Sequence, residues 1–135
     1  MRVYLGGNIH TSWRRQVVDA CPSIEFLQPY KDDQARFVRT EEGVSLLPLS
    51  HFVLRDLLFI RSCDVILGYI TNYAEHSRHH GLMIELGYAK ALRKSIVLVA
   101  EMPEFDFAIE MADIVFATLA QGAEYLNFLT LRNPI

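Results

Sequence analysis

The sequence contains few cysteines, no cluster of basic residues and no long apolar run. Cys21 and Cys63 lie far apart and lack the paired spacing of a zinc or redox motif, so we expect two reduced thiols. No segment approaches the roughly 20 apolar residues that a membrane-spanning helix needs. The opening MRVYLGGNIH also lacks an apolar stretch of signal-peptide length. These absences favour a cytoplasmic protein.

The charge balance argues against binding a nucleic acid polymer. The formal net charge is −3, and no run of Lys or Arg concentrates positive potential on one segment. A small-molecule ligand is therefore expected. With 135 residues, of which 51% are hydrophobic and 21% charged, the chain has the composition of one globular domain spanning 1–135. We find no internal repeat, linker or low-complexity tract that would divide it.

Short apolar runs rich in β-branched residues alternate with segments of helical period, which is typical of parallel strands joined by crossover helices. We expect five strands, at 2–7, 24–29, 64–70, 95–100 and 113–118. Helices are expected at 12–21, 51–63, 81–92, near 105–111 and at 123–131. Thr11 or Ser12 and then Ser50 are expected to cap the first two helices. Right-handed crossovers predict a doubly wound α/β sheet with helices on both faces, which binds ligands beyond the carboxyl ends of its strands.

Two acids lie on apolar helix faces. Within the expected helix 81–92, no basic residue stands three, four or seven positions from Glu85. Asp56 shares its face with apolar residues, while Arg55 and Arg61 are expected to point elsewhere. Because burying an unpaired carboxylate is costly, either both helices are rotated toward water or the acids meet near the end of strand 64–70. Glu85 also lies about one turn after the helix start, where the helix dipole favours an anion, so we expect it to be ionised.

An ionised carboxylate beside a second carboxyl that holds or shuttles a proton is suited to breaking a glycosidic bond with retention. One acid would act as nucleophile and the other as acid/base. Paired acids also bind Mg²⁺ through phosphates, so these two residues alone do not name a reaction.

Three segments, RVYLGGNIH, RDLLFIRSCDVIL and GLMIELGYAKAL, resemble in this order the nucleoside 2-deoxyribosyltransferase family and its relatives, the 2′-deoxynucleoside 5′-phosphate N-hydrolases. The family joins a Y-x-x-G-x-I strand end, a D-x-x-x-x-x-x-x-D-V element and an E-x-G-x-A helix. The resemblance implies a flavodoxin-like or Rossmann-like five-stranded parallel sheet. It also implies an enzyme that works without a metal or another cofactor.

Carried over by position, the resemblance implies that Glu85 attacks C1′ of the sugar and forms a covalent glycosyl ester. Asp56 matches an acid that helps to protonate the departing base or orients the sugar. Tyr4 matches a tyrosine that positions the nucleophile and the sugar, although a buried strand aromatic would read the same way. Asp64 begins a strand and is expected to bond backbone rather than perform chemistry.

Substrate binding is expected around the first strand end and the start of the glutamate helix. Gly6 and Gly7 let backbone N–H groups approach a ligand, and a plain turn would also explain them. The following NIHTSWR supplies Asn8 and His10, together with Thr11, Ser12 and Arg14, where the phosphohydrolase relatives bind a 5′-phosphate. Asn8 stands in place of their serine, so selectivity for nucleotide over nucleoside stays open. Gly81, at the helix start, is expected to border the substrate.

The two polar loops are less informative. The segment 30–48 is expected to cross one end of the sheet. Residues Glu75, His76, His79 and His80 could form a metal cluster, but a polar loop explains them equally and the family needs no metal. Tyr73 or a histidine of this loop could stack on the leaving base.

Family members assemble as dimers or larger oligomers in which a neighbouring subunit completes each pocket. The resemblance therefore implies a homodimer or higher homo-oligomer, with Asp106 reaching toward a sugar hydroxyl. The sequence leaves two further readings open: a catalytically inactive nucleotide- or nucleoside-binding module on the same fold, and a flavodoxin-like interaction protein without a ligand.

Overall fold

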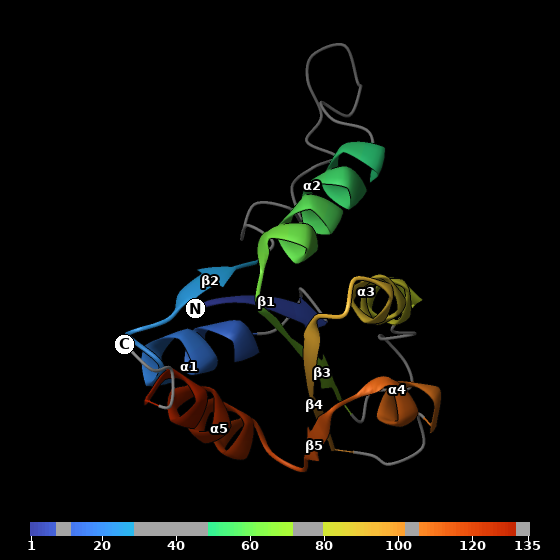
Figure 1. The fold of residues 1–135 in the computed structure, drawn as a ribbon. Coiled ribbons are helices and arrows are strands. Elements are labelled where there is room, and N and C mark those ends of the chain that lie inside the picture. Colours follow the sequence, from blue (N-terminus) through green and yellow to red (C-terminus); the bar gives the residue numbers. More distant parts are fainter. Residues whose placement is uncertain (8–11, 29–48, 72–79, 102–105, 132–135) are drawn as a thin grey trace.

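The computed structural model describes residues 1–7, 12–28, 49–71, 80–101 and 106–131, with the backbone alone at 49–52 and Asp106. Within these residues five strands form one parallel sheet in the order β2-β1-β3-β4-β5. The strands are β1 (Arg2–Gly7), β2 (Glu25–Leu27), β3 (Val65–Ile70), β4 (Ser95–Ala100) and β5 (Ile114–Phe116). The helices are α1 (Trp13–Ala20), α2 (Leu49–Ser62), α3 (His80–Ala91), α4 (Asp106–Met111) and α5 (Leu119–Leu131). The expected doubly wound α/β fold is confirmed (Figure 1).

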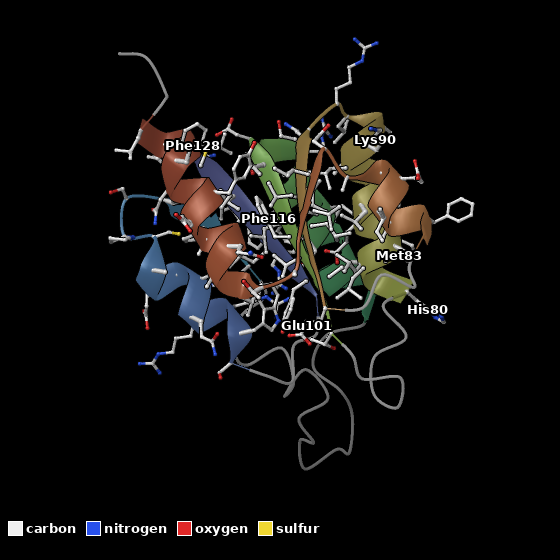
Figure 2. The ribbon with its side chains drawn as sticks, turned by 90° about the horizontal axis from the view of Figure 1, so that it is seen from below. His80, Met83, Lys90, Glu101, Phe116 and Phe128 are labelled. Atoms are coloured by element: carbon white, nitrogen blue, oxygen red, sulfur yellow. The ribbon has the colours of Figure 1, made fainter. Side chains whose placement is uncertain are left out.

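Helices cover both faces of this sheet. Alternate residues of the strands point to opposite faces, so β1 sends Val3 and Leu5 to one core and Tyr4 to the other. Helices α1 and α5 close the first core, and α2, α3 and α4 close the second. Every residue of β3 is buried, as expected for a central parallel strand covered on both sides. Figure 2 shows the side chains that fill the space between the helices and the sheet.

The chain reverses its winding between β1 and β3. These strands are hydrogen-bonded neighbours, with Gly7 opposite Tyr69 near their carboxyl ends. After β1 the next helix is α1, on one face, whereas after β3 it is α3, on the other. In doubly wound sheets ligands bind beyond the strand ends at such a switch point. The fold therefore predicts a ligand site at the rim of the sheet beside Gly7.

Several predicted boundaries were wrong. Helix α5 begins at Leu119 rather than 123, because Thr118 and Gln121 form a reciprocal cap. The hydroxyl of Thr118 accepts from the Gln121 N–H at 3.2 Å, and Gln121 Oε1 accepts from the Thr118 N–H at 3.2 Å. Ser50 lies inside α2 instead of capping it. Ser12 occupies the N-cap position of α1 but makes no side-chain capping bond.

The two loops predicted at 30–48 and 71–81 lie almost wholly outside the described residues. In the parts of the chain that the structure does describe, no helix combines the length and the apolar character needed to cross a bilayer.

Candidate active site

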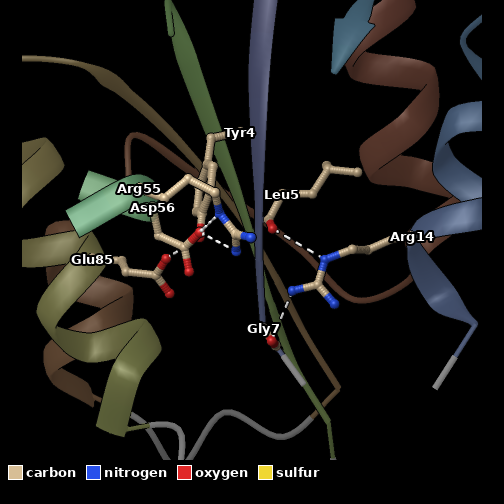
Figure 3. Close-up of polar contacts among 7 residues, drawn as sticks. All are labelled: Tyr4, Leu5, Gly7, Arg14, Arg55, Asp56 and Glu85. Carbon is tan, nitrogen blue, oxygen red and sulfur yellow. Dashed lines mark hydrogen bonds and ion pairs between the residues drawn. The ribbon is translucent and has the colours of Figure 1, made fainter. Parts of the chain in front are cut away.

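The side chains of Tyr4 and Glu85 meet near the carboxyl ends of the central strands. Tyr4 comes from the middle of β1, and Glu85 lies in α3 one turn after the helix begins. The Tyr4 hydroxyl donates a hydrogen bond to Oε2 of Glu85 (Figure 3). Tyr4 is almost fully buried in the core beneath α2 and α3. Tyr4 is therefore not only a buried strand aromatic. Its ring packs in the core, and its hydroxyl is hydrogen-bonded to an acid.

Burial dominates the electrostatics of Glu85. Its neighbours on α3, Leu82, Leu86 and Ala89, are buried. The pKa of Glu85 is raised to about 7, mainly by burial and further by the charge of Asp56. The hydrogen bond from Tyr4 and the charge of Arg14 act in the opposite direction. The expectation that the helix start keeps Glu85 fully ionised is therefore wrong, since near neutral pH this carboxyl exists in both protonation states.

The same environment keeps Tyr4 protonated. Burial raises the pKa of Tyr4 well above its ordinary value, and the charges of Glu85 and Asp56 raise it further. A phenol in this state donates its proton and does not become an anion. The hydrogen bond between the two side chains consequently has one direction, from Tyr4 to Glu85.

Asp56 has a partner that the sequence reading excluded. The Nη2 and Nε atoms of Arg55 lie 2.7 Å and 3.0 Å from Oδ1 of Asp56. Adjacent residues of a helix project about 100° apart, but the long side chain of Arg55 folds back along α2 to reach its neighbour. The expectation that Arg55 points elsewhere is wrong. The charge of Asp56 raises the pKa values of Glu85 and Tyr4, so the two acids share one electrostatic environment.

Gly6 gives Tyr4 and Glu85 the space to meet. A methyl group on Gly6 would lie 3.0 Å from Cδ1 of Leu82 and 3.3 Å from Cε1 of Tyr4. It would also lie 3.7 Å from Oε1 of Glu85. Any larger side chain would therefore intrude where the carboxylate sits.

Gly7 has a different constraint. Its φ of 146° is a conformation that residues with side chains rarely adopt. A methyl group there would lie 2.9 Å from the carbonyl oxygen of Tyr69 and 3.1 Å from the Trp13 ring. The backbone at the end of β1 therefore requires glycine on steric grounds alone.

Arg14, which the sequence offered among the residues around a 5′-phosphate, instead has a structural role that the sequence did not assign. This residue of α1 is only 8% exposed. Its Nε donates to the carbonyl of Leu5 at 3.2 Å and its Nη2 to the carbonyl of Gly7 at 2.8 Å. The guanidinium thus holds the carboxyl end of β1, and its charge lowers the pKa of Glu85. A signal was present, because Arg14 lies three residues before Val17 on the buried face of its helix.

The other expected site residues are less informative. Gly81 is exposed in the first turn of α3, and no atom would touch a methyl group placed on it. Asp106 begins α4, and its side chain is outside the described part of the chain, as are Asn8, His10 and residues 75–79. Asp64 directly precedes β3, at the amino ends of the strands and away from the site, where its Oδ2 accepts from the Arg2 backbone N–H at 2.8 Å. Its expected backbone role is confirmed.

Three solved structures have similar folds. A 2-deoxyribosyltransferase from Bacillus psychrosaccharolyticus has a TM-score of 0.68 and 19% identity, over 97% of this chain and 96% of that one. A 2-desoxiribosyltransferase from Leishmania mexicana has a TM-score of 0.67 and 18% identity, over 94% and 97%. The CMP N-glycosidase BcmB from Clostridium botulinum has a TM-score of 0.60 and 15% identity, over 96% and 99%. At these identities the likeness establishes the fold.

The family follows from the sequence model rather than from these structures. No curated protein matches the chain. A family model described as nucleoside 2-deoxyribosyltransferase like matches residues 1–102, which include β1 with Tyr4, α2 with Asp56 and α3 with Glu85. The match covers well over half of the chain, which therefore belongs to the nucleoside 2-deoxyribosyltransferase-like family.

Proposed function

We propose that this protein is an enzyme that cleaves or transfers the N-glycosidic bond of a nucleoside or nucleoside 5′-monophosphate. The observation that carries the proposal is the hydrogen bond from Tyr4 to the partly buried carboxyl of Glu85, beside Asp56 at the switch point of the sheet. Membership of the family supports it, as does the fold shared with two deoxyribosyltransferases and a CMP N-glycosidase.

In the proposed reaction a carboxylate oxygen of Glu85 attacks C1′ of the sugar. The C1′–N bond breaks, its electron pair leaves with the base, and the base takes up a proton. The product is a glycosyl ester of Glu85. Water then attacks C1′, loses a proton and releases Glu85 as the carboxylate, or a second base does so and the reaction is a transfer.

Three side chains have defined roles in this proposal. The hydroxyl of Tyr4 holds Oε2 of Glu85, which orients the carboxylate and helps to keep it charged. Asp56 lies near enough for its charge to act on both residues. From there it orients a sugar hydroxyl or passes a proton to the departing base.

The remaining parts of the proposal concern substrate binding and assembly. Gly6, Gly7, Asn8 and His10 would surround the sugar and its 5′ end, and Gly81 would border it from α3. We propose that the chain acts in the cytoplasm as a homodimer or larger homo-oligomer in which Asp106 reaches a neighbouring site. Phe107, which follows Asp106, is 85% exposed and suits such a contact. Light scattering coupled to size exclusion would test it, and a monomer at micromolar concentration would contradict it.

The central test is a base-release assay. Purified protein is incubated with ribo- and deoxyribonucleosides and their 5′-monophosphates, with and without a second free base, and the products are separated by chromatography. We expect at least one substrate to release base, and Glu85→Gln to reduce this rate by about three orders of magnitude or more while melting as a folded protein. Mass spectrometry of protein quenched during turnover should find the mass of one sugar on the peptide containing Glu85.

A negative panel would favour another function. If no substrate releases base but a nucleoside or nucleotide raises the melting temperature, the protein is a binding module on the same fold. If no compound in the panel binds, the result favours a flavodoxin-like interaction protein without a ligand.

A further inference from the structure

Arg55 is folded into the candidate site instead of extending into solvent. Two of its nitrogens donate to the same oxygen, Oδ1 of Asp56, and the side chains of both residues are only 22% exposed. The Cζ atom of Arg55 lies 5.6 Å from the centre of the Phe59 ring, one helical turn away. Phe59 in turn lies 6.5 Å from the Tyr4 ring. Arg55 is thus held by Asp56 on one side (Figure 3) and by the Phe59 ring, which packs near Tyr4, on the other.

Given the proposed function, we infer that Arg55 is a positioning residue that keeps Asp56 ionised and turned to accept a hydrogen bond from a sugar hydroxyl. Asp56 is then an anchor for the sugar and not the proton donor to the leaving base, whose proton comes from solvent water. Oδ1 already accepts two N–H groups from a cation, an arrangement that stabilises the carboxylate form and resists its protonation.

The surroundings of Asp56 are consistent with this division of roles. The charge of Asp56 acts on two titratable groups of other elements, Tyr4 on β1 and Glu85 on α3. Tyr4 stays protonated, and Glu85 is the acid whose proton is lost near neutral pH. The two carboxyl groups therefore have different environments: the carboxyl of Asp56 is paired with a guanidinium, and the carboxyl of Glu85 is hydrogen-bonded to a phenol. When the environments of two paired acids differ in this way, the two acids can perform different chemical tasks.

The two possible roles of Asp56 predict opposite effects of removing the guanidinium. Arg55→Gln makes protonation of Asp56 easier. If Asp56 is an anchor, the variant should lose kcat/KM by about tenfold or more even at pH 8.5, mainly through a higher KM. If Asp56 is the proton donor, the variant should instead keep or gain activity at that pH, because more of Asp56 would carry the proton.

The experiment measures kcat and KM from pH 5 to 9 for the wild type, Arg55→Gln, Arg55→Lys and Arg61→Gln, using the best substrate of the panel. Arg61 is an exposed arginine of the same helix and serves as the matched control. We expect Arg55→Lys to recover part of the loss, because it restores the positive charge but not the two-donor geometry. Melting temperatures of all four proteins separate loss of function from loss of fold.

A second measurement does not depend on turnover. Carbon-detected NMR of labelled aspartate should show Asp56 losing its charge at higher pH in Arg55→Gln than in the wild type or in Arg61→Gln. Unchanged titration of Asp56, or activity that is kept or gained in Arg55→Gln at pH 8.5, would overturn the inference. If the wild type releases no base from any substrate, the proposed function fails, and the NMR titration still decides whether Arg55 controls the charge of Asp56.

Discussion

The Tyr4 hydroxyl donates to Oε2 of Glu85 across 81 positions of sequence, joining the first strand to the third helix. Burial raises the pKa values of both groups. Since the phenol stays protonated, it supplies a fixed hydrogen-bond donor to a carboxyl that must lose its own proton in order to act as a nucleophile. The contact therefore links the fold directly to the protonation state of the proposed nucleophile.

Removing that donor should make the acid harder to ionise. In Tyr4→Phe we expect kcat/KM at pH 7 to fall by about tenfold to a hundredfold, because the lost hydrogen bond lowers the pKa of Glu85 in the wild type. The activity of the variant should recover toward the wild-type value at higher pH. A pH profile of base release measures this, and an equal loss at every pH would assign Tyr4 a purely geometric role.

The activity itself should depend on pH near neutrality. A nucleophilic carboxylate with a pKa of about 7 is mostly protonated at pH 6 and mostly charged at pH 8. We therefore expect kcat/KM to rise about tenfold for each pH unit below this midpoint and to level off above it. Initial rates from pH 5 to 9 in buffers of constant ionic strength test this. If kcat/KM instead stays constant down to pH 5, Glu85 is already ionised at that pH, which would contradict a pKa of about 7.

Stability should change over the same range in the opposite sense. The folded pKa of Glu85, about 7, lies above the ordinary value of 4.5, so the folded state binds the proton more tightly than the unfolded state. This contribution is fully present below about pH 4.5 and is lost as pH rises through 7. At about 1.4 kcal/mol per pKa unit, the loss is on the order of 3 kcal/mol.

The matched comparison for this stability effect is Glu85→Gln, which cannot titrate at that position. Denaturant unfolding at pH 4.5, 6 and 8 should show the wild type losing free energy of unfolding relative to the variant. A constant difference between the two proteins would contradict the raised pKa.

Glycine substitutions should separate steric crowding at the site from ordinary backbone effects. Gly6→Ala places a methyl 3.0 Å from Leu82 and 3.3 Å from Tyr4, so we expect a folded protein destabilised by about 1 kcal/mol, with base release reduced about tenfold. Gly87→Ala, in the same helix as Glu85, touches nothing within 4 Å and should gain about 0.5–1 kcal/mol. Melting curves and base-release rates of both variants test this. A loss of activity in Gly87→Ala as large as that in Gly6→Ala would remove the steric explanation.

The sequence predicts the fold well because hydrophobic alternation records which residues face a core. All five strands and all five helices of the described residues were expected, and the strand 95–100 was placed without error. The start of α5 was missed although its Thr118 to Gln121 cap was legible, and the strand before it was predicted to reach 118, whereas β5 ends at Phe116.

The site was only partly predictable, for a different physical reason. Helical spacing placed Glu85 and Asp56 on the apolar faces of their helices, because spacing reports which face a residue occupies. It could not show where the flexible side chain of Arg55 would end, or that burial would outweigh the helix dipole at Glu85. Those outcomes depend on residues brought together by folding. The roles of Asn8, His10, Gly81 and Asp106 and the single domain over 1–135 stay predictions.

The reversal of winding between β1 and β3 has a consequence for how this protein could change its substrate. The helices that follow these two strands, α1 and α3, lie on opposite faces of the sheet. Tyr4 and Glu85 are held by a strand and a helix and not by either connection. Under the proposed function, insertions or exchanges in the segments after β1 and β3 should therefore alter which base is accepted while Tyr4 and Glu85 keep their places.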